Sequence, residues 1–251
     1  NDFYANLGTR TVRLSPEYDH ESNLPEYSLK STLTEFPVPS PLETREQLKK
    51  LKNGRAPGID GIRALTVKNN LDFFTPILKH LIERIFVTSR FPDILKRAST
   101  VLVHKKGDHE DLRNYRPISL LSIFSKVVEQ VMSSYITDHL ERNCVLAEAQ
   151  FGFRRNRGTQ DAVLHMQDFV SNALDTEFIP VVVLLDFSAA FDSVQHQRLL
   201  CKLDSIGVRG GALTLIRSYL ENRTQQLRCG DRVSGHTTVR CGVPQGGSLS
   251  A

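Results

Sequence analysis

Apolar side chains recur at helical spacing over much of this chain. Residues 41–53 are one predicted helix: Ser40 and Glu43 have the spacing of a capping box, and Pro41 falls at the first helical position. Residues 122–141 are a longer one, with six apolar side chains on one face: Val127, Val128, Val131, Tyr135, Ile136 and Leu140. The same reasoning predicts four further helices: 75–86 (opened by Thr75-Pro76), 159–176, 197–206 and 212–220.

Shorter apolar runs between turn residues predict strands at 98–104, 181–185, 224–229 and 237–241. The most distinctive run extends from Ile179 to Leu185, interrupted only by Pro180, and is followed directly by the carboxylate of Asp186. Its β-branched residues suit a strand that is buried on both faces. Because helices alternate with few strands, we expect an α+β fold.

Asp186 is the candidate functional residue of this segment. An ionised carboxylate at the end of a buried strand needs a charge partner, and a divalent metal ion is the natural one. Hard cations such as Mg²⁺ take carboxylate oxygens and share them with substrate phosphates. From the residues alone two interpretations stay open: a metal ligand, or an Asp that caps the next turn.

Composition and charge limit the class of protein and its expected location in the cell. Residues 1–40 hold six acidic side chains and three Lys or Arg, are rich in Pro and Ser, and are predicted to form a linker or a loosely ordered arm. The remainder has 29 basic and 22 acidic side chains, which fits either a polyanionic partner or ordinary solvated surface. The four cysteines form no C-x-x-C pair, and no membrane span or secretory signal is present. We therefore expect an intracellular protein of the cytoplasm and nucleus, with no membrane partner.

Five sequence blocks carry a family resemblance: G-R-A-P-G-I-D-G-I at 54–62, N-Y-R-P-I-S-L-L at 114–121, Q-F-G-F-R-R-N-R-G-T at 150–159, V-V-L-L-D-F-S-A-A-F at 182–191 and G-V-P-Q-G-G-S-L-S at 242–250. In this order and spacing the chain resembles the reverse transcriptases of non-LTR (LINE-type) retrotransposons, from about Leu42 to its last residue. The resemblance implies a right-hand polymerase fold, with helical fingers over 41–178 and a partial palm over 179–251. It also implies RNA-directed DNA polymerase activity by two-metal catalysis in the intact polyprotein.

The sequence departs from the family pattern after the P-Q-G block. The family carries a Tyr- or Phe-x-Asp-Asp hairpin there, and no such string occurs in this sequence. We therefore expect a palm truncated before the second catalytic hairpin, a chain that is inactive by itself, and an unpaired, apolar sheet edge beside the Asp186 strand. The remaining palm and thumb, and an endonuclease domain, are expected elsewhere in the polyprotein.

The resemblance assigns roles to particular residues. Asp186 is the catalytic residue and a ligand of Mg²⁺, or of Mn²⁺, together with the backbone carbonyl of Phe187. Phe191 is a steric gate that favours deoxynucleotides over ribonucleotides. The resemblance implies that five residues contact the deoxynucleoside triphosphate: Lys105, Arg116, Phe191, Gln245 and Gly246. It also implies that three arginines contact the RNA template and DNA primer: Arg154, Arg155 and Arg157.

Each of these roles has a structural alternative. Phe191 is also consistent with a core aromatic, the loop 105–114 with a solvated basic loop, and Gln245 with a plain turn residue. The arginines are consistent with an exposed turn that packs Phe151 and Phe153 into the core. For the whole chain, the alternatives are a non-catalytic nucleic-acid-binding remnant of a decayed element and a host-domesticated structural protein.

Overall fold

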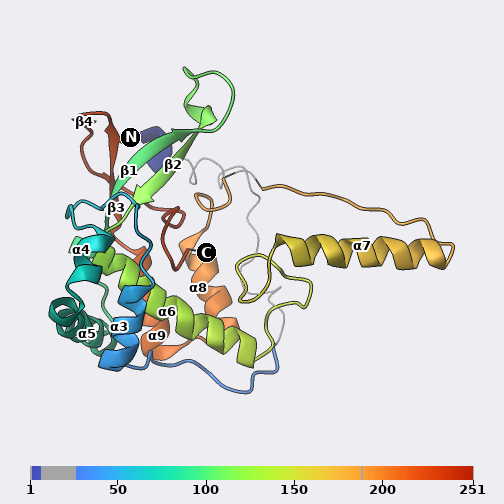
Figure 1. The fold of residues 1–251 in the computed structure, drawn as a ribbon, viewed down its shortest axis with the longest axis horizontal. Helices are drawn as coiled ribbons and strands as arrows, with labels where there is room; N and C mark the ends of the chain where they lie inside the picture. The colour runs from blue at the N-terminus through green and yellow to red at the C-terminus, as the bar shows by residue number, and fades with distance from the viewer. Residues whose placement is uncertain (1, 7–26, 188, 251) are drawn as a thin grey trace.

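The computed structural model describes residues 2–6, 27–187 and 189–250, and combines helices with one β-sheet, in agreement with the predicted α+β class (Figure 1). In chain order the helices are α1 (Asp2–Ala5), α3 (Pro41–Lys49), α4 (Ala64–Asn69), α5 (Leu71–Thr88), α6 (Ile123–Arg142), α7 (Thr159–Asp175), α8 (His196–Ser205) and α9 (Gly210–Leu220), with short 3-10 helices η1 (Asp93–Lys96) and η2 (Leu112–Asn114). The strands are β1 (Arg97–His104), β2 (Tyr115–Leu120), β3 (Thr224–Cys229), β4 (Arg232–Val233) and β5 (Thr237–Thr238). None of the helices among these residues is long and apolar enough to cross a lipid bilayer.

The hydrophobic core lies among α3, α4, α5, α6 and α9, which gather below the sheet in Figure 1. Leu48, Leu78, Ile82, Val127 and Leu215 are almost completely buried there. Each such side chain stabilises the fold by roughly 1.5–3 kcal/mol relative to leaving it in water. The amphipathic pattern that predicted α6 therefore identified its buried face correctly.

The predicted capping box at the start of α3 is confirmed. The Ser40 hydroxyl accepts a hydrogen bond from the Glu43 N–H (3.2 Å), and the Ser40 N–H donates to the Glu43 carboxylate (2.7 Å). The helix ends at Lys49 rather than near residue 53, because Leu51 turns back into the core with its N–H on the Leu48 carbonyl.

The predicted start of α5 is wrong by four residues. The helix begins at Leu71, and Pro76 lies inside it rather than at its first position. The first turn is closed by the N–H groups of Phe73 and Phe74 on the Asn70 carbonyl. Pro76 removes one backbone donor from the second turn, while the Thr75 hydroxyl supplies a donor to the Leu71 carbonyl (2.6 Å). The helix therefore continues through the proline at the cost of one backbone hydrogen bond.

The sheet has the order β2-β1-β3-β4, with β5 also paired to β3. β1 runs antiparallel to β2, with Val101 opposite Ile118, and parallel to β3, with Ser99 opposite Gln226. The predicted strands at 98–104 and 224–229 are confirmed. Residues 237–241 contribute two residues to the sheet, where Thr238 pairs with Thr224.

The predicted buried strand at 181–185 is wrong for this structure. Residues 179–187 form neither strand nor helix, and the large apolar side chains among them are 48–90% exposed. β1 already has β2 and β3 as neighbours, so the described sheet offers this segment no place beside β1. Without a ladder partner an apolar segment cannot satisfy its backbone groups away from water. In Figure 1 the segment returns from the far end of α7, a helix with no buried residues, toward the body of the molecule.

The expected loose arm at residues 1–40 is only partly compatible with the structure. Residues 7–26 lie outside the described residues. Leu33 exchanges backbone hydrogen bonds with Gly207 and Arg209 (2.8 and 2.9 Å), and Phe36 is buried in the helical core. The part of this segment nearest α3 is therefore integrated into the fold.

Candidate functional site

Three of the sequence blocks meet at the P-Q-G turn. The Gln245 carbonyl accepts a hydrogen bond from the N–H of Ser119 in β2 (2.9 Å), and the Val243 N–H donates to the Phe191 carbonyl (2.9 Å). The turn closes with the Gly247 N–H on the Pro244 carbonyl (3.0 Å). The backbone therefore brings the predicted nucleotide contacts Phe191 and Gln245 into one place.

The glycines of this block are required by close approach. Gly242 has a φ of +87°, and a Cβ there would lie 2.7 Å from the Asp192 carbonyl oxygen. Gly246 has a φ of +112°, and a Cβ there would lie 3.2 Å from the Ser119 carbonyl oxygen. Side chains larger than hydrogen would push the turn away from both neighbouring segments.

Asp192 lies at the same junction. Together with Gln245 and Ser119 it lines a small cavity of about 30 Å³. Burial raises the pKa of the Asp192 carboxyl above its usual range. The position of Asp192 is compatible with a turn or helix cap and with a functional acid.

Asp192→Asn is expected to stabilise the chain at neutral pH and to have little effect at acidic pH. A carboxyl whose pKa is raised in the folded state favours folding while it is protonated, and that contribution is lost as pH rises through the folded pKa. Asn keeps the shape and removes the buried charge. Thermal unfolding of both proteins at pH 4 and pH 7 measures the difference, and an equal shift in Tm at both values would show that Asp192 ionisation does not oppose folding.

Lys105 and Arg116 lie at the loop end of the β1–β2 hairpin, beside the connection 105–114. The Lys105 N–H donates to the Asn114 carbonyl (2.8 Å), and Arg116 stands opposite Val103 in the sheet. Both side chains are exposed, and neither forms an ion pair with any residue that the structure describes. The two cations are therefore available to an anionic ligand, as is the adjacent Lys106.

Asp186 and Phe187 lie in the exposed segment 179–187, and their predicted metal site stays untested. Across residues 2–6, 27–187 and 189–250, no three His, Cys, Asp or Glu side chains come together as metal ligands would. The described residues therefore do not complete a metal site, and Asp186 with the Phe187 carbonyl forms at most one part of it.

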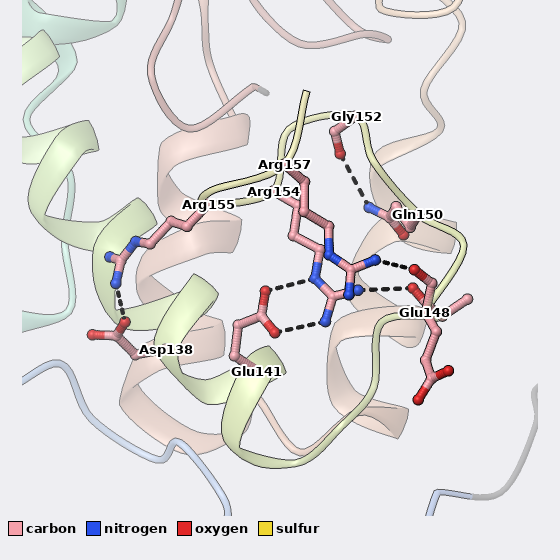
Figure 2. Close-up of polar contacts among 9 residues, drawn as sticks. Asp138, Glu141, Glu148, Gln150, Gly152, Arg154, Arg155 and Arg157 are labelled. Carbon is pink, nitrogen blue, oxygen red and sulfur yellow. Dashed lines mark hydrogen bonds and ion pairs between the residues drawn. The ribbon is translucent and has the colours of Figure 1, made fainter. Parts of the chain in front are cut away.

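The three predicted RNA-binding arginines have different surroundings (Figure 2). Arg154 makes a bidentate pair with Glu141 of α6 (2.8 Å for each bond) and donates to the Ala147 carbonyl, with only 12% of its side chain exposed. Arg155 contacts Asp138 (2.6 Å) and is 57% exposed. Arg157 donates to the Glu148 carbonyl and lies over the Phe151 ring. Arg154 thus ties the loop to α6, whereas Arg155 presents much of its length to solvent.

Phe153 and Phe191 form an edge-to-face pair with ring centres 6.4 Å apart. Phe153 is 76% exposed, so the alternative in which it packs into the core is wrong. The half-buried Phe191 ring is instead braced from one side by an exposed aromatic of the preceding block.

A basic pocket lies beside the N-terminal half of α6. It has a volume of about 190 Å³, and its lining includes Lys50, Lys52, Arg55 and Lys126 and no carboxylate. Lys126 is nearly buried, and its burial together with the nearby Arg55 lowers the pKa of its ammonium group. Gly58 also lines the pocket, and it lies so close to the end of β2 that a Cβ there would be 2.5 Å from the Leu121 backbone.

Glu129, Lys126 and Tyr219 lie at or near this site but belong to none of the sequence blocks. Glu129 is completely buried on α6 beside the P-Q-G turn, and its carboxylate accepts a hydrogen bond from the Ser248 N–H (2.9 Å). The signal was available in the helical pattern, since a Glu between Val128 and Val131 falls on the face that packs inward.

The comparisons with known proteins agree with this arrangement. The family described as reverse transcriptase (RNA-dependent DNA polymerase) matches residues 103–251, more than half of the chain. The chain therefore belongs to the reverse transcriptase family, and the resemblance drawn from the sequence blocks is confirmed.

The relatives belong to mobile elements. The chain is 31% identical over 208 residues to the probable RNA-directed DNA polymerase from transposon BS of Drosophila melanogaster, covering 82% of this chain and 23% of that protein. It is 28% identical over 208 residues to the RNA-directed DNA polymerase from mobile element jockey of the same species, with the same coverage. It is 27% identical over 196 residues to the retrovirus-related Pol polyprotein from type-1 retrotransposable element R2 of Popillia japonica, covering 78% of this chain and 26% of that protein. The chain spans about a quarter of the length of these relatives.

Proposed function

We propose that this chain forms the fingers and the first part of the palm of an RNA-directed DNA polymerase, which copies retrotransposon RNA into DNA in the cytoplasm and nucleus. The observation that carries the proposal is the junction of Ser119, Phe191 and Gln245, where three motif blocks far apart in sequence share backbone hydrogen bonds. Family membership supports the same reaction.

The proposed nucleotide site combines the Phe191 ring at this junction with the cations beside the loop that connects β1 and β2. Nucleotidyl transfer by attack of a primer 3′-hydroxyl depends on positioning and charge neutralisation more than on covalent chemistry by the protein. Arg116 and Lys105 form no ion pair with a described residue and supply cations for the triphosphate, Arg as a bidentate donor and Lys as a point charge. Phe191 lies under the sugar and excludes a 2′-hydroxyl, while the Gln245–Gly246 backbone borders the base pair.

Asp186 and the Phe187 carbonyl are the proposed ligands for Mg²⁺ or Mn²⁺. Such an ion, when bound, stabilises the attacking and leaving oxygens of an in-line displacement. Asp186 has no ion pair with any described residue, so its carboxylate is available. The other ligands come from outside the described residues.

The nucleic-acid side uses two basic surfaces. Arg155 and Arg157 follow Phe153 in the same loop, and Phe153 is an exposed ring on which a base can stack. The Lys126 pocket holds four cationic side chains around a space with no carboxylate, which suits phosphates of the RNA template. Both surfaces gather positive charge where the template approaches the fingers.

Primer extension tests the proposed function. The protein encoded by the open reading frame that contains this chain, supplied with an RNA template, a DNA primer and Mg²⁺, is expected to incorporate templated deoxynucleotides. The isolated 251-residue chain is expected to bind RNA without extending a primer. An open reading frame that closes before a second acidic motif, with no incorporation, would support the decayed remnant instead. An open reading frame that continues past this chain, but whose protein neither binds RNA nor incorporates nucleotides, would support a domesticated structural protein.

RNA binding by the 251-residue chain is expected to depend on salt through Arg155 and Arg157. Replacing both by Ala should reduce the slope of log affinity against log salt by roughly one unit for each phosphate that the protein no longer neutralises. Arg154→Ala is the control: it removes one arginine charge from the same loop but breaks the Glu141 pair, so it should lower Tm more than it changes the slope. Equal slopes for the double variant and the wild type would show that Arg155 and Arg157 do not contact RNA phosphates.

A further inference from the structure

Glu129 holds the backbone that follows the P-Q-G turn. One carboxylate oxygen accepts from the Ser125 hydroxyl one turn earlier in α6 (2.8 Å). The other accepts from the Ser248 N–H (2.9 Å), and the Leu249 N–H also favours the ionised carboxylate. A helix in the fingers is thereby bonded directly to a segment more than 100 residues later.

Polar partners surround this carboxylate. Burial raises the pKa of the Glu129 carboxyl above its usual range, and the nearby guanidinium of Arg223 and the three donors named above offset part of that rise. Arg223 is itself buried, donates to the Tyr219 carbonyl (3.1 Å) and lies 4.6 Å from the centre of the Tyr219 ring. A buried carboxylate without such partners would be strongly destabilising.

Gly247 shows how closely the two segments approach. A Cβ at Gly247 would lie 2.7 Å from a carboxylate oxygen of Glu129, so a larger residue there would force the carboxylate or the turn to shift. Two residues earlier in the chain, the Gln245 carbonyl accepts a hydrogen bond from the Ser119 N–H. The turn is therefore held by Glu129 as well as by β2 and the Phe191 backbone.

We propose that Glu129 is a positioning residue for the incoming nucleotide, acting through the P-Q-G turn. It fixes the backbone of Gly247–Leu249 so that Gln245 and Gly246 stay beside Phe191. This inference rests on the proposed function, because Gln245 and Gly246 border the nucleotide only in a polymerase.

Glu129→Gln tests the proposal, since it keeps the shape and replaces one of the two acceptor oxygens, which hold Ser125 and the backbone after the turn, with an amide NH2 group. In the 251-residue chain, hydrogen exchange at residues 247–249 is expected to quicken about tenfold or more. In the protein encoded by the containing open reading frame, the KM for deoxynucleotide is expected to rise about tenfold, with RNA affinity unchanged. Glu129→Asp should behave like Glu129→Gln, because the shorter side chain keeps the charge but does not reach the turn.

Ser125→Ala is the matched control. It removes a hydrogen bond from the same buried carboxylate without touching the turn, so stability should fall while exchange at 247–249 and the KM stay near wild type. If Glu129→Gln fails to fold, Gly247→Ala takes its place, because its Cβ displaces the turn from an intact Glu129.

The outcomes separate the two proposals. A folded Glu129→Gln with wild-type exchange and KM overturns the positioning role, as does an equal KM increase in Ser125→Ala. A wild-type protein that incorporates no nucleotide overturns the proposed function and, with it, the nucleotide role of Glu129. Faster exchange in Glu129→Gln would then leave only a structural link between α6 and the turn.

Discussion

Asp186→Asn is expected to abolish DNA synthesis by the protein encoded by the containing open reading frame. The substitution preserves size and removes the charge that a divalent ion requires. Metal stabilisation of transition-state charge contributes several kcal/mol, so the rate of incorporation should fall by about a thousandfold or more. Single-turnover primer extension measures this rate, and RNA affinity measured in parallel should stay unchanged, because Asp186 lies in the exposed segment 179–187.

Asp168→Asn provides the control for this experiment. Asp168 is an exposed residue of α7 and undergoes the same change in charge. Its variant should synthesise DNA at the wild-type rate. Normal synthesis by Asp186→Asn would remove Asp186 from the metal site and leave it as a turn residue.

Phe191→Ala is expected to relax the choice between deoxynucleotides and ribonucleotides. The ring lies beside Phe153 and its backbone carbonyl is bonded to Val243, so the side chain has a fixed position from which to clash with a 2′-hydroxyl. Removing it should raise ribonucleotide incorporation relative to deoxynucleotide by roughly ten- to a hundredfold, since each 1.36 kcal/mol of discrimination corresponds to about a factor of ten.

The measurement is the ratio of kcat/KM for the two sugars opposite the same template base. Phe169→Ala, which removes an exposed ring from α7, should leave the ratio unchanged. An unchanged ratio in Phe191→Ala, accompanied by a lower Tm, would assign Phe191 to packing alone.

Local sequence signals predicted much of this fold. Ser40 and Glu43 specify the start of α3 through side chains three residues apart, and the apolar face of α6 repeats within one helix. Pro76 misled the prediction of α5 because proline is common at the first helical position but can also lie a few residues later when the helix continues around it.

Features that depend on distant partners were less predictable. The run 179–185 has the composition of a buried strand, but composition does not reveal whether a neighbouring strand is available. Among the candidate site residues, the motifs predicted that Phe191 and Gln245 would share a site. The contact of Glu129 with Ser248 depends on how α6 meets the turn, which no short motif encodes.

The parallel pairing of β1 with β3 also determines the order in which the sheet can form during synthesis. Residues 97–104 and 224–229 are separated by about 120 residues, whereas β2 follows β1 almost immediately. On a ribosome adding roughly 5–20 residues per second, the β1–β2 hairpin waits on the order of 6–24 seconds with one edge open. Throughout that interval the nascent chain presents hydrogen-bonding groups to any neighbouring chain, so crowded polysomes are where this protein is most exposed to mispairing.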